Sequence, residues 1–331
     1  MPAFPLPCRN GNRIQMPPKL ENGQWVKNKT KSLLDYAIKF NDDLQTLSYG
    51  SYTILKLICV SYYAEVFAKI AKGPSAKNQG YDAAVYIDLF AGPGIVSIED
   101  TNERVVGSPL AVASSDLKFD YYVFVEKNKK NNEALGQRLP KLLNPKQYLL
   151  IHGDCNANVQ SIIQHIRSRF KKPIIFAFVD PEGMEIKWDT VRQLSTNFSE
   201  LDFMINVSTG ASRIGGKLEA GKEGYRPIFE DYFQAKAEDI LLQINKGITV
   251  QKVYTEAVQQ TLGRSAGKTI PICDNGNNLM YNILGYTRQS PSGSPWANAG
   301  FGTLDQRLRD ADGKLVTRIL DVISGRAKSL D

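Results

Sequence analysis

Residues 85–94 read VYIDLFAGPG, a run of β-branched and aromatic residues that reaches an aspartate and then enters a Gly-Pro-Gly turn. Such an apolar run is typical of a strand that is buried on both faces of a parallel sheet. Gly92 and Gly94 lack a Cβ, so the backbone of the turn can approach a ligand closely. The stretch therefore predicts a central strand followed by a nucleotide-binding turn.

The spacing of the glycines separates two classes of nucleotide cofactor. A dinucleotide fingerprint, GxGxxG, opens a helix, but Ser97 occupies its third glycine position and no helical pattern is evident before residue 108. This disfavours a nicotinamide cofactor. An aspartate near the strand end followed by one GxG is instead the form of the first motif of S-adenosyl-L-methionine (SAM) methyltransferases. A single GxG also marks any tight turn. On the SAM hypothesis, the expected cofactor residues here are Asp88, Phe90, Ala91, Gly92 and Gly94.

Strand and helix patterns alternate after residue 81, which predicts a doubly wound, Rossmann-like α/β fold. Strands are expected at 85–90, 121–126, 148–153, 174–180 and 201–207, with helices between them at 108–115, 128–139, 156–169 and 188–197. Two further strands, 268–273 and 279–288, flank the turn DNGNN. The pattern predicts a mostly parallel seven-stranded sheet closed by an antiparallel hairpin, which distinguishes the SAM-methyltransferase fold from other doubly wound folds.

The same alternation of patterns predicts the domain organisation. Residues 1–80 are expected to form an N-terminal helical segment, with helices at 25–47 and 53–71 and a loop at 72–80. Residues 81–331 are expected to form a methyltransferase-like catalytic domain with an insertion at about 208–262. That insertion contains helical patterns at 227–234 and 253–262, and residues 307–323 predict a final amphipathic helix.

Composition narrows the classes of protein. The 331 residues are 42% hydrophobic and 23% charged, as in an ordinary soluble protein, and no signal peptide or membrane span is evident, so a cytoplasmic protein is expected. The net charge of +7 favours an anionic partner, with nucleic acid first and a membrane surface second, although a mildly basic enzyme has the same charge.

The cysteines and histidines of the chain disfavour a disulfide framework, a metal site and a catalytic triad. The four cysteines are far apart without a CxxC pair, which predicts reduced thiols; they are Cys8, Cys59, Cys155 and Cys273. Only His152 and His165 occur, so catalytic triads and a metal site are not expected.

Acidic residues stand at successive strand ends, where a doubly wound sheet binds its ligand. Glu126 follows the second strand and can accept hydrogen bonds from both ribose hydroxyls of SAM. Asp154 follows the third strand, with Cys155 beside it, and can accept from the adenine amino group. The alternative for Asp154 is an ordinary helix N-cap.

Asp180 at the fourth strand end is expected to serve the methyl acceptor. Asp180 and the carbonyl of Pro181 can accept the hydrogens of an exocyclic base amine, as in the Asp-Pro-Pro-aromatic loop of amino methyltransferases, where the aromatic side chain stacks on a flipped-out base. Here Glu182 stands at the aromatic position, so Phe90 or Trp188 would have to replace it. Asp-Pro-Glu-Gly is also an ordinary turn, which leaves a structural role open.

Basic residues gather after the fifth strand. Arg213, Lys217, Lys222 and Arg226 fall in the predicted insertion, on the side of the sheet where a substrate would enter. We expect Arg213 and Lys217, with Trp188, to contact the substrate, and basic loops there can hold a phosphate backbone. A solvated loop face is the alternative.

The chain resembles a named family. The motifs that carry the resemblance are YIDLFAGPG, GSPL at 107–110, FVEKN at 124–128, GDCNAN at 153–158, FVDPEGMEIKW at 178–188 and an aromatic-rich segment near the end. Together they are similar to the three-Cys-motif partner (TcmP) proteins over roughly residues 25–300. The resemblance implies a bacterial SAM-dependent methyltransferase fold paired with a separate three-cysteine protein, without a defined substrate. Glu182 departs from the family's tyrosine, which puts base stacking in doubt.

Two hypotheses follow from these patterns. The first is a SAM-dependent methyltransferase that modifies nucleic acid, with Asp180, Pro181 and Glu182 at the catalytic position. The second is a weakly active or inactive methyltransferase-fold subunit that serves as the binding partner of a three-cysteine protein. Glu182 is the residue that keeps the second hypothesis open.

Overall fold

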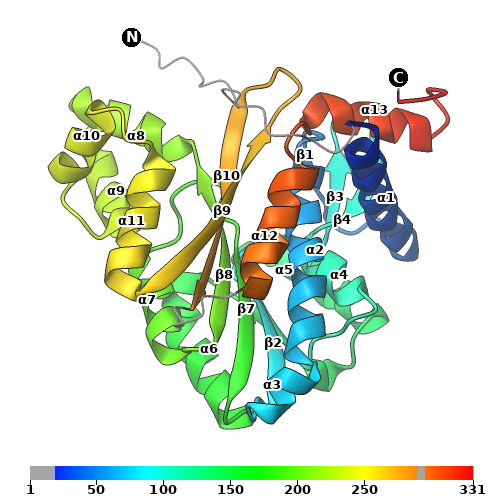
Figure 1. Ribbon diagram of the computed structural model, residues 1–331, viewed down its shortest axis with the longest axis horizontal. Coiled ribbons are helices and arrows are strands. Elements are labelled where there is room, and N and C mark those ends of the chain that lie inside the picture. The colour runs from blue at the N-terminus through cyan, green and yellow to red at the C-terminus, as the bar shows by residue number, and fades with distance from the viewer. Residues whose placement is uncertain (1–18, 289–294, 331) are drawn as a thin grey trace.

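A computed structural model of the chain describes residues 19–288 and 295–330, and its centre is a twisted seven-stranded sheet (Figure 1). Strand β10 runs antiparallel to both of its neighbours, and the other adjacent strands are parallel. The predicted doubly wound α/β fold with a closing hairpin is therefore confirmed. In spatial order the strands are β6 (Tyr148–His152), β5 (Tyr121–Glu126), β2 (Ala83–Asp88), β7 (Pro173–Val179), β8 (Leu201–Ser208), β10 (Leu279–Arg288) and β9 (Arg264–Cys273).

Alternating side chains of the central strands build two separate cores. In β2, Tyr86 joins the core on one face, whereas Val85 and Ile87 join the core on the other; β7 divides Phe176 and Ala177 in the same way. This alternation explains why the strands read as continuous apolar runs, since both faces are covered.

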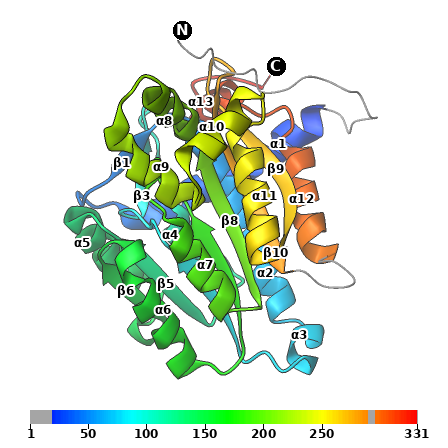
Figure 2. The ribbon, with the colours of Figure 1, turned by 90° about the vertical axis from the view of Figure 1, so that its left-hand side faces the viewer.

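Helices cover both faces, as Figures 1 and 2 show from two sides. One face carries α2 (Thr53–Ala71), α4 (Ser108–Ser114) and α12 (Pro295–Arg307), with α1 (Lys19–Ala37) and α13 (Gly313–Ile323) outside them. The opposite face carries α6 (Cys155–Arg169), α7 (Trp188–Asn197), α9 (Arg226–Phe233) and α11 (Val250–Leu262). Helix α5 (Lys129–Arg138) joins β5 to β6 at the edge of the sheet.

The N-terminal segment differs from its prediction. Helix α1 ends at Ala37 and continues only as the short 3₁₀ helix η1 (Ile38–Phe40), because Asp42 hydrogen-bonds the backbone N–H of Leu44 at 3.3 Å and turns the chain. Strand β1 (Leu47–Tyr49) begins at the last residue of the predicted helix and was not predicted. It pairs with β3 (Ile95–Ile98), which also pairs with β4 (Arg104–Val106), in a second small sheet.

Helices α1 and α2 share a core with the main sheet. Val26 and Leu33 of α1 and Phe67 of α2 belong to the same buried cluster as Phe176 of β7 and Ile319 of α13. The loop expected at 72–80 contains the short helix α3 (Pro74–Asn78). The final helix predicted over 307–323 begins only at Gly313, after its N-cap Asp312.

The segment between β8 and β9 folds into four α-helices and one short 3₁₀ helix at one end of the sheet (upper left in Figure 1). Helices α9 and α11 match the predicted patterns, whereas α8 (Gly210–Glu219) and α10 (Ala237–Asn245) were not predicted. Three glycines in α8, at 210, 215 and 216, conceal it because glycine has a low intrinsic helix propensity.

The cysteine prediction is correct only in part. Cys59 and Cys155 are free, buried thiols, but Cys273 is disulfide-bonded, which corrects the expectation of reduced thiols throughout. None of the helices within the described ranges is both long and apolar enough to cross a membrane.

Candidate active site

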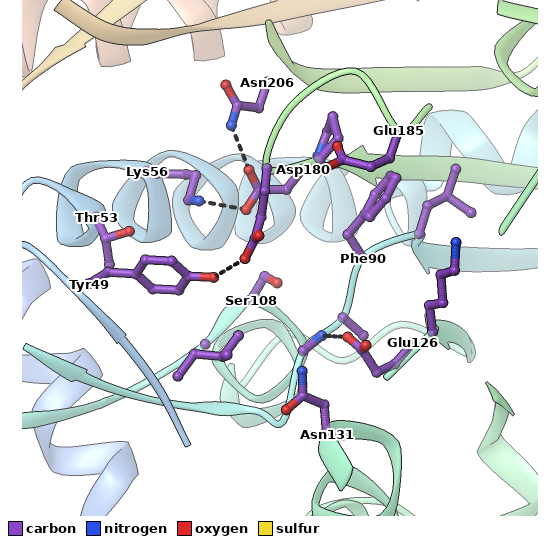
Figure 3. A pocket seen from close by; sticks show the side chains of 18 of the residues that line it. Tyr49, Thr53, Lys56, Phe90, Ser108, Glu126, Asn131, Asp180, Glu185 and Asn206 are labelled. Carbon is purple, nitrogen blue, oxygen red and sulfur yellow. Dashed lines mark hydrogen bonds and ion pairs between the residues drawn. The ribbon is translucent and has the colours of Figure 1, made fainter. Parts of the chain in front are cut away.

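A cavity of about 860 Å³ opens where β2, β5, β7 and β8 end. From β2 the chain proceeds to β5 and β6 on one side and to β7 and β8 on the other, so the strand order reverses between β2 and β7. Ligands of doubly wound sheets bind at this switch point. Figure 3 shows its two ends: Glu126 and Asn131 lie at one, and Lys56, Asp180 and Asn206 lie at the other.

The Gly-Pro-Gly turn forms one wall of the cavity. Gly92 and Gly94 have φ angles of 63° and 88°, in the left-handed region that only glycine adopts readily. The Gly94 carbonyl accepts a hydrogen bond from Gly107 N at 2.7 Å, which fixes the turn against the start of α4. The turn leads into strand β3 instead of a helix, which agrees with the absence of a dinucleotide fingerprint.

A prediction follows from Gly94. A Cβ at this position would lie 2.8 Å from Leu110 Cδ1 and 2.9 Å from Leu110 Cγ, and it would also force an L residue into a positive φ. We expect Gly94→Ala to lower the free energy of unfolding by ~1–3 kcal/mol and to weaken cofactor binding. Urea denaturation measures the first effect. Gly216→Ala is the matched control because its Cβ meets nothing within 4 Å; equal stability of the two variants would contradict the prediction.

Asp88 supports the turn and does not line the cavity, which corrects its predicted cofactor contact. The side chain is fully buried and accepts hydrogen bonds from Tyr86 Oη at 3.1 Å and from Phe90 N at 3.2 Å. Burial raises the pKa of Asp88 to about 7, although hydrogen bonds from Ser108 and Phe90 oppose the rise. Its role is to fix the backbone from which Phe90, Ala91 and Gly92 line the cavity.

Glu126 connects the end of β5 to the glycine turn. Its Oε2 accepts from Gly92 N at 2.7 Å, and its Oε1 accepts from Asn128 N at 2.6 Å. The carboxylate is therefore held in one orientation at the cavity wall. Each oxygen of a carboxylate can accept two hydrogen bonds, so capacity remains for a ligand with two hydroxyl groups.

Asp154 is the N-cap of α6, as the alternative interpretation predicted, and it also lines the cavity. Its carboxylate accepts from Asn156 N at 2.8 Å and pairs with Lys127 Nζ at 2.9 Å. Burial opposes ionisation, but these hydrogen bonds and the Lys127 charge outweigh it and lower the pKa of Asp154. Cys155 also lines the cavity, and burial raises its thiol pKa to about 12, so the thiol is protonated near neutral pH.

Asp180 lies just after β7 and has partners on both carboxylate oxygens. Oδ2 pairs with Lys56 Nζ at 2.7 Å, and Oδ1 accepts from Asn206 Nδ2 at 2.8 Å (Figure 3). Burial disfavours the charge on Lys56, but Asp180 more than compensates and raises the Lys56 pKa. Lys56 comes from α2 in the N-terminal segment and was not predicted as a site residue, although it interrupts the most apolar helix of the chain.

Tyrosines surround the Asp180 end of the cavity. Tyr49 from β1 donates a hydrogen bond to Glu182 Oε1 at 2.7 Å, and Tyr52 packs edge-on against Tyr281 with 6.1 Å between ring centroids. All three tyrosines line the cavity, as do Pro181 and Phe90. This cluster was not predicted, because its members come from two distant parts of the chain, the N-terminal segment and the hairpin.

Two predicted substrate residues lie outside the cavity lining. Trp188 is only 2% exposed and packs edge-on against Tyr254 in the core, so it cannot stack on a ligand. Lys217 is held over the ring of Tyr225 and donates to its hydroxyl at 3.2 Å. Arg213 does line the cavity.

Arg226 corrects the predicted basic cluster. Its guanidinium is shared among three carboxylates, Glu223, Glu230 and Glu238. This local neutralisation reduces its availability to a phosphate.

Comparisons with known proteins find similarity to solved structures at low sequence identity. No family model and no curated protein matches the chain. Among solved structures, an O-methyltransferase from Bacillus cereus in complex with SAH is 11% identical, with 80% of this chain and 96% of that chain covered and a TM-score of 0.41. Cofactor-bound Rv0187 from MTB is also 11% identical, with 83% and 91% covered and a TM-score of 0.41.

The fold class itself rests on the sheet. The strand order β6-β5-β2-β7-β8-β10-β9, with β10 alone antiparallel, is that of the Rossmann-like methyltransferase fold.

Proposed function

We propose that the protein is a SAM-dependent methyltransferase whose acceptor is an exocyclic amine of a nucleic acid base. The observation that carries the proposal is the single cavity that joins the glycine turn and Glu126 to Asp180. A methyl transfer needs the methyl donor and the acceptor in one enclosed space and in line, and alignment alone contributes up to ~7–11 kcal/mol of barrier lowering.

The chemistry of the first end supports SAM as the cofactor. SAM supplies an electrophilic methyl group on a sulfonium. The backbone of Gly92 and Gly94 can approach the amino-acid part of SAM, and the oriented Glu126 carboxylate can accept both ribose hydroxyls. Asp154 and Cys155 also line the cavity, and on this proposal they would contact the adenine, with Asp154 able to accept from its amino group.

Asp180 and the tyrosines support an amine on a planar acceptor. Asp180 and the Pro181 carbonyl can accept the two amine hydrogens, which directs the nitrogen lone pair at the methyl carbon. SAM, held by the glycine turn and Glu126, would supply the methyl group and keep the S–C electron pair on sulfur, and the Asp180 carboxylate would accept the amine proton. Tyr49, Tyr52 and Tyr281 supply ring surfaces for a base, which compensates for the missing aromatic residue at Glu182.

Methyl-labelled SAM tests the proposal with the purified protein and three separate pools of DNA, RNA and protein. We expect label in nucleic acid, on a base amine after digestion to nucleosides. Label on protein, on a sugar or on a ring carbon would contradict the proposed acceptor.

A second candidate function is a binding subunit for a separate three-cysteine protein. The observation that favours it is the engagement of the reactive side chains: both Asp180 oxygens have protein partners, and Glu182 accepts from Tyr49. Stable co-purification with a three-cysteine protein, combined with no transfer to any of the three pools by the purified complex, would favour this function over the first.

A further inference from the structure

We infer that Lys56 is a specificity-determining residue of the acceptor end, which together with Asp180 selects bases that carry an amine beside an unprotonated ring nitrogen. Adenine has this arrangement at N6 and N1, and cytosine has it at N4 and N3. The inference rests on the proposed function, because it concerns the acceptor of that same reaction.

The pair presents one donor and one acceptor side by side to the cavity. Lys56 Nζ lies 2.7 Å from Asp180 Oδ2, and both residues line the cavity with side chains that are 14% exposed. An ammonium has three N–H donors, of which the ion pair uses one, whereas a carboxylate only accepts. An amine placed on Asp180 therefore brings its neighbouring ring nitrogen towards a Lys56 donor.

The surroundings hold this pair in a fixed geometry. Asn206 Nδ2 donates to Asp180 Oδ1 at 2.8 Å, so the carboxylate cannot rotate freely. The Lys56 ammonium lies 5.1 Å from the ring centroid of Tyr281 and 5.9 Å from that of Tyr49 (Figure 3 shows Tyr49). The donor and the acceptor therefore lie beside aromatic ring surfaces that also line the cavity.

Stability alone does not account for a lysine at this position. The flanking α2 residues Leu55, Leu57 and Ile58 are 0–3% exposed, and replacing a buried ion pair by packed apolar residues is often neutral or stabilising. Lys29 provides the contrast within the chain. It pairs with Glu65 at 2.8 Å and lies 5.6 Å from the ring centroid of Tyr62, but it is not among the cavity-lining residues.

Two matched pairs of nucleosides test the inference in the presence of S-adenosylhomocysteine. Adenosine is compared with inosine, and cytidine with uridine, because the second member of each pair has a carbonyl in place of the amine. We expect the wild-type protein to prefer the amine-bearing member of at least one pair by about tenfold or more. Lys56→Met should reduce that preference to about twofold, and the control Lys29→Met should retain it.

A chemical variant of the ligand keeps the test decisive if Lys56→Met does not fold. 1-Deazaadenosine and 3-deazacytidine retain the amine but lack the ring nitrogen, so the wild-type protein should bind them about tenfold more weakly than the parent nucleosides. Equal binding of parent and deaza compounds, an undiminished preference in folded Lys56→Met, or no nucleoside binding at millimolar concentration would overturn the inference.

Cofactor binding separates failure of the inference from failure of the proposed function. Each variant is first titrated with S-adenosylhomocysteine. A wild-type protein that does not bind it fails the proposed function, whereas one that binds it and does not discriminate between the nucleosides fails the inference alone.

Discussion

Asp180→Asn is expected to lower the rate of methyl transfer by ~10²–10⁴-fold, while the affinity for SAM changes by less than about threefold. Asparagine keeps the size of the side chain but removes the charge and one of the two acceptor oxygens. The amine then loses the group that orients it and takes its proton. We expect SAM affinity to be spared because the residues proposed to hold the cofactor, Glu126 and the glycine turn, lie at the other end of the cavity. Single-turnover transfer from labelled SAM and calorimetric titration measure the two quantities.

Asp180→Asn also breaks the ion pair with Lys56, so the variant needs a folding control and a matched surface substitution. Removing one partner of a buried pair leaves an uncompensated charge, so thermal unfolding must show that Asp180→Asn is folded at the assay temperature. Asp231→Asn makes the same substitution in a surface pair, since Asp231 lies 2.7 Å from Lys187 with side chains 50% and 55% exposed. It should transfer at the wild-type rate. Transfer by Asp180→Asn within tenfold of wild type would remove Asp180 from the mechanism.

Arg138→Met is expected to lower the free energy of unfolding by ~3–5 kcal/mol. Arg138 is fully buried and donates to Asp42 Oδ1 at 2.6 Å, and also to the carbonyls of Gln45 at 2.8 Å and Pro93 at 2.7 Å. Methionine fills most of the space but leaves these carbonyl groups without their donor. Because Pro93 belongs to the glycine turn, we also expect weaker SAM binding by the folded variant.

Asp42 and a surface arginine provide the controls for this prediction. Burial opposes ionisation of Asp42, but its hydrogen bond and ion pair with Arg138 hold its pKa below the usual value. Adding Asp42→Asn to Arg138→Met should therefore restore part of the lost stability, as urea denaturation would show. Arg192→Met removes an exposed pair with Asp189 and should cost less than about 1 kcal/mol. A similar cost for Arg138→Met and Arg192→Met would contradict the stabilising role assigned to Arg138.

The sheet could be predicted because each of its strands contains a local apolar run, although β9 begins at Arg264, four residues before the predicted strand. The strand predicted at 121–126 matches β5, and that at 201–207 matches β8 apart from one residue. Strands β1, β3 and β4 were missed, since they have only three or four residues each and β1 is defined by its pairing with β3, a distant segment in which Val96 lies opposite Leu47. No local pattern reports such pairing.

Apart from Arg213, the candidate site could be predicted only near the ends of strands. Gly92, Glu126, Asp154 and Asp180 were found in this way, and all four line the cavity. Lys56 lies 124 positions before Asp180, and only folding brings the two together. A single lysine in an otherwise apolar helix was the available signal.

Trp188 shows the opposite error. It lies only eight positions after Asp180, but it begins α7, whose buried face turns the indole into the core. Closeness in sequence to a site residue therefore did not place this side chain in the site.

Calorimetric titration of the purified protein with SAM, S-adenosylhomocysteine and NAD, repeated on Glu126→Ala, tests the central claim most directly. Glu126 accepts a hydrogen bond from Gly92 N and, on this account, would also accept from both ribose hydroxyls. Glu126→Ala should therefore weaken SAM binding by roughly 10²-fold or more. The control is Glu133→Ala on α5, which removes an exposed carboxylate and should bind SAM as the wild type does. The account predicts that wild type binds SAM and its product but not NAD. Absence of SAM binding, or unchanged affinity in Glu126→Ala, would contradict it.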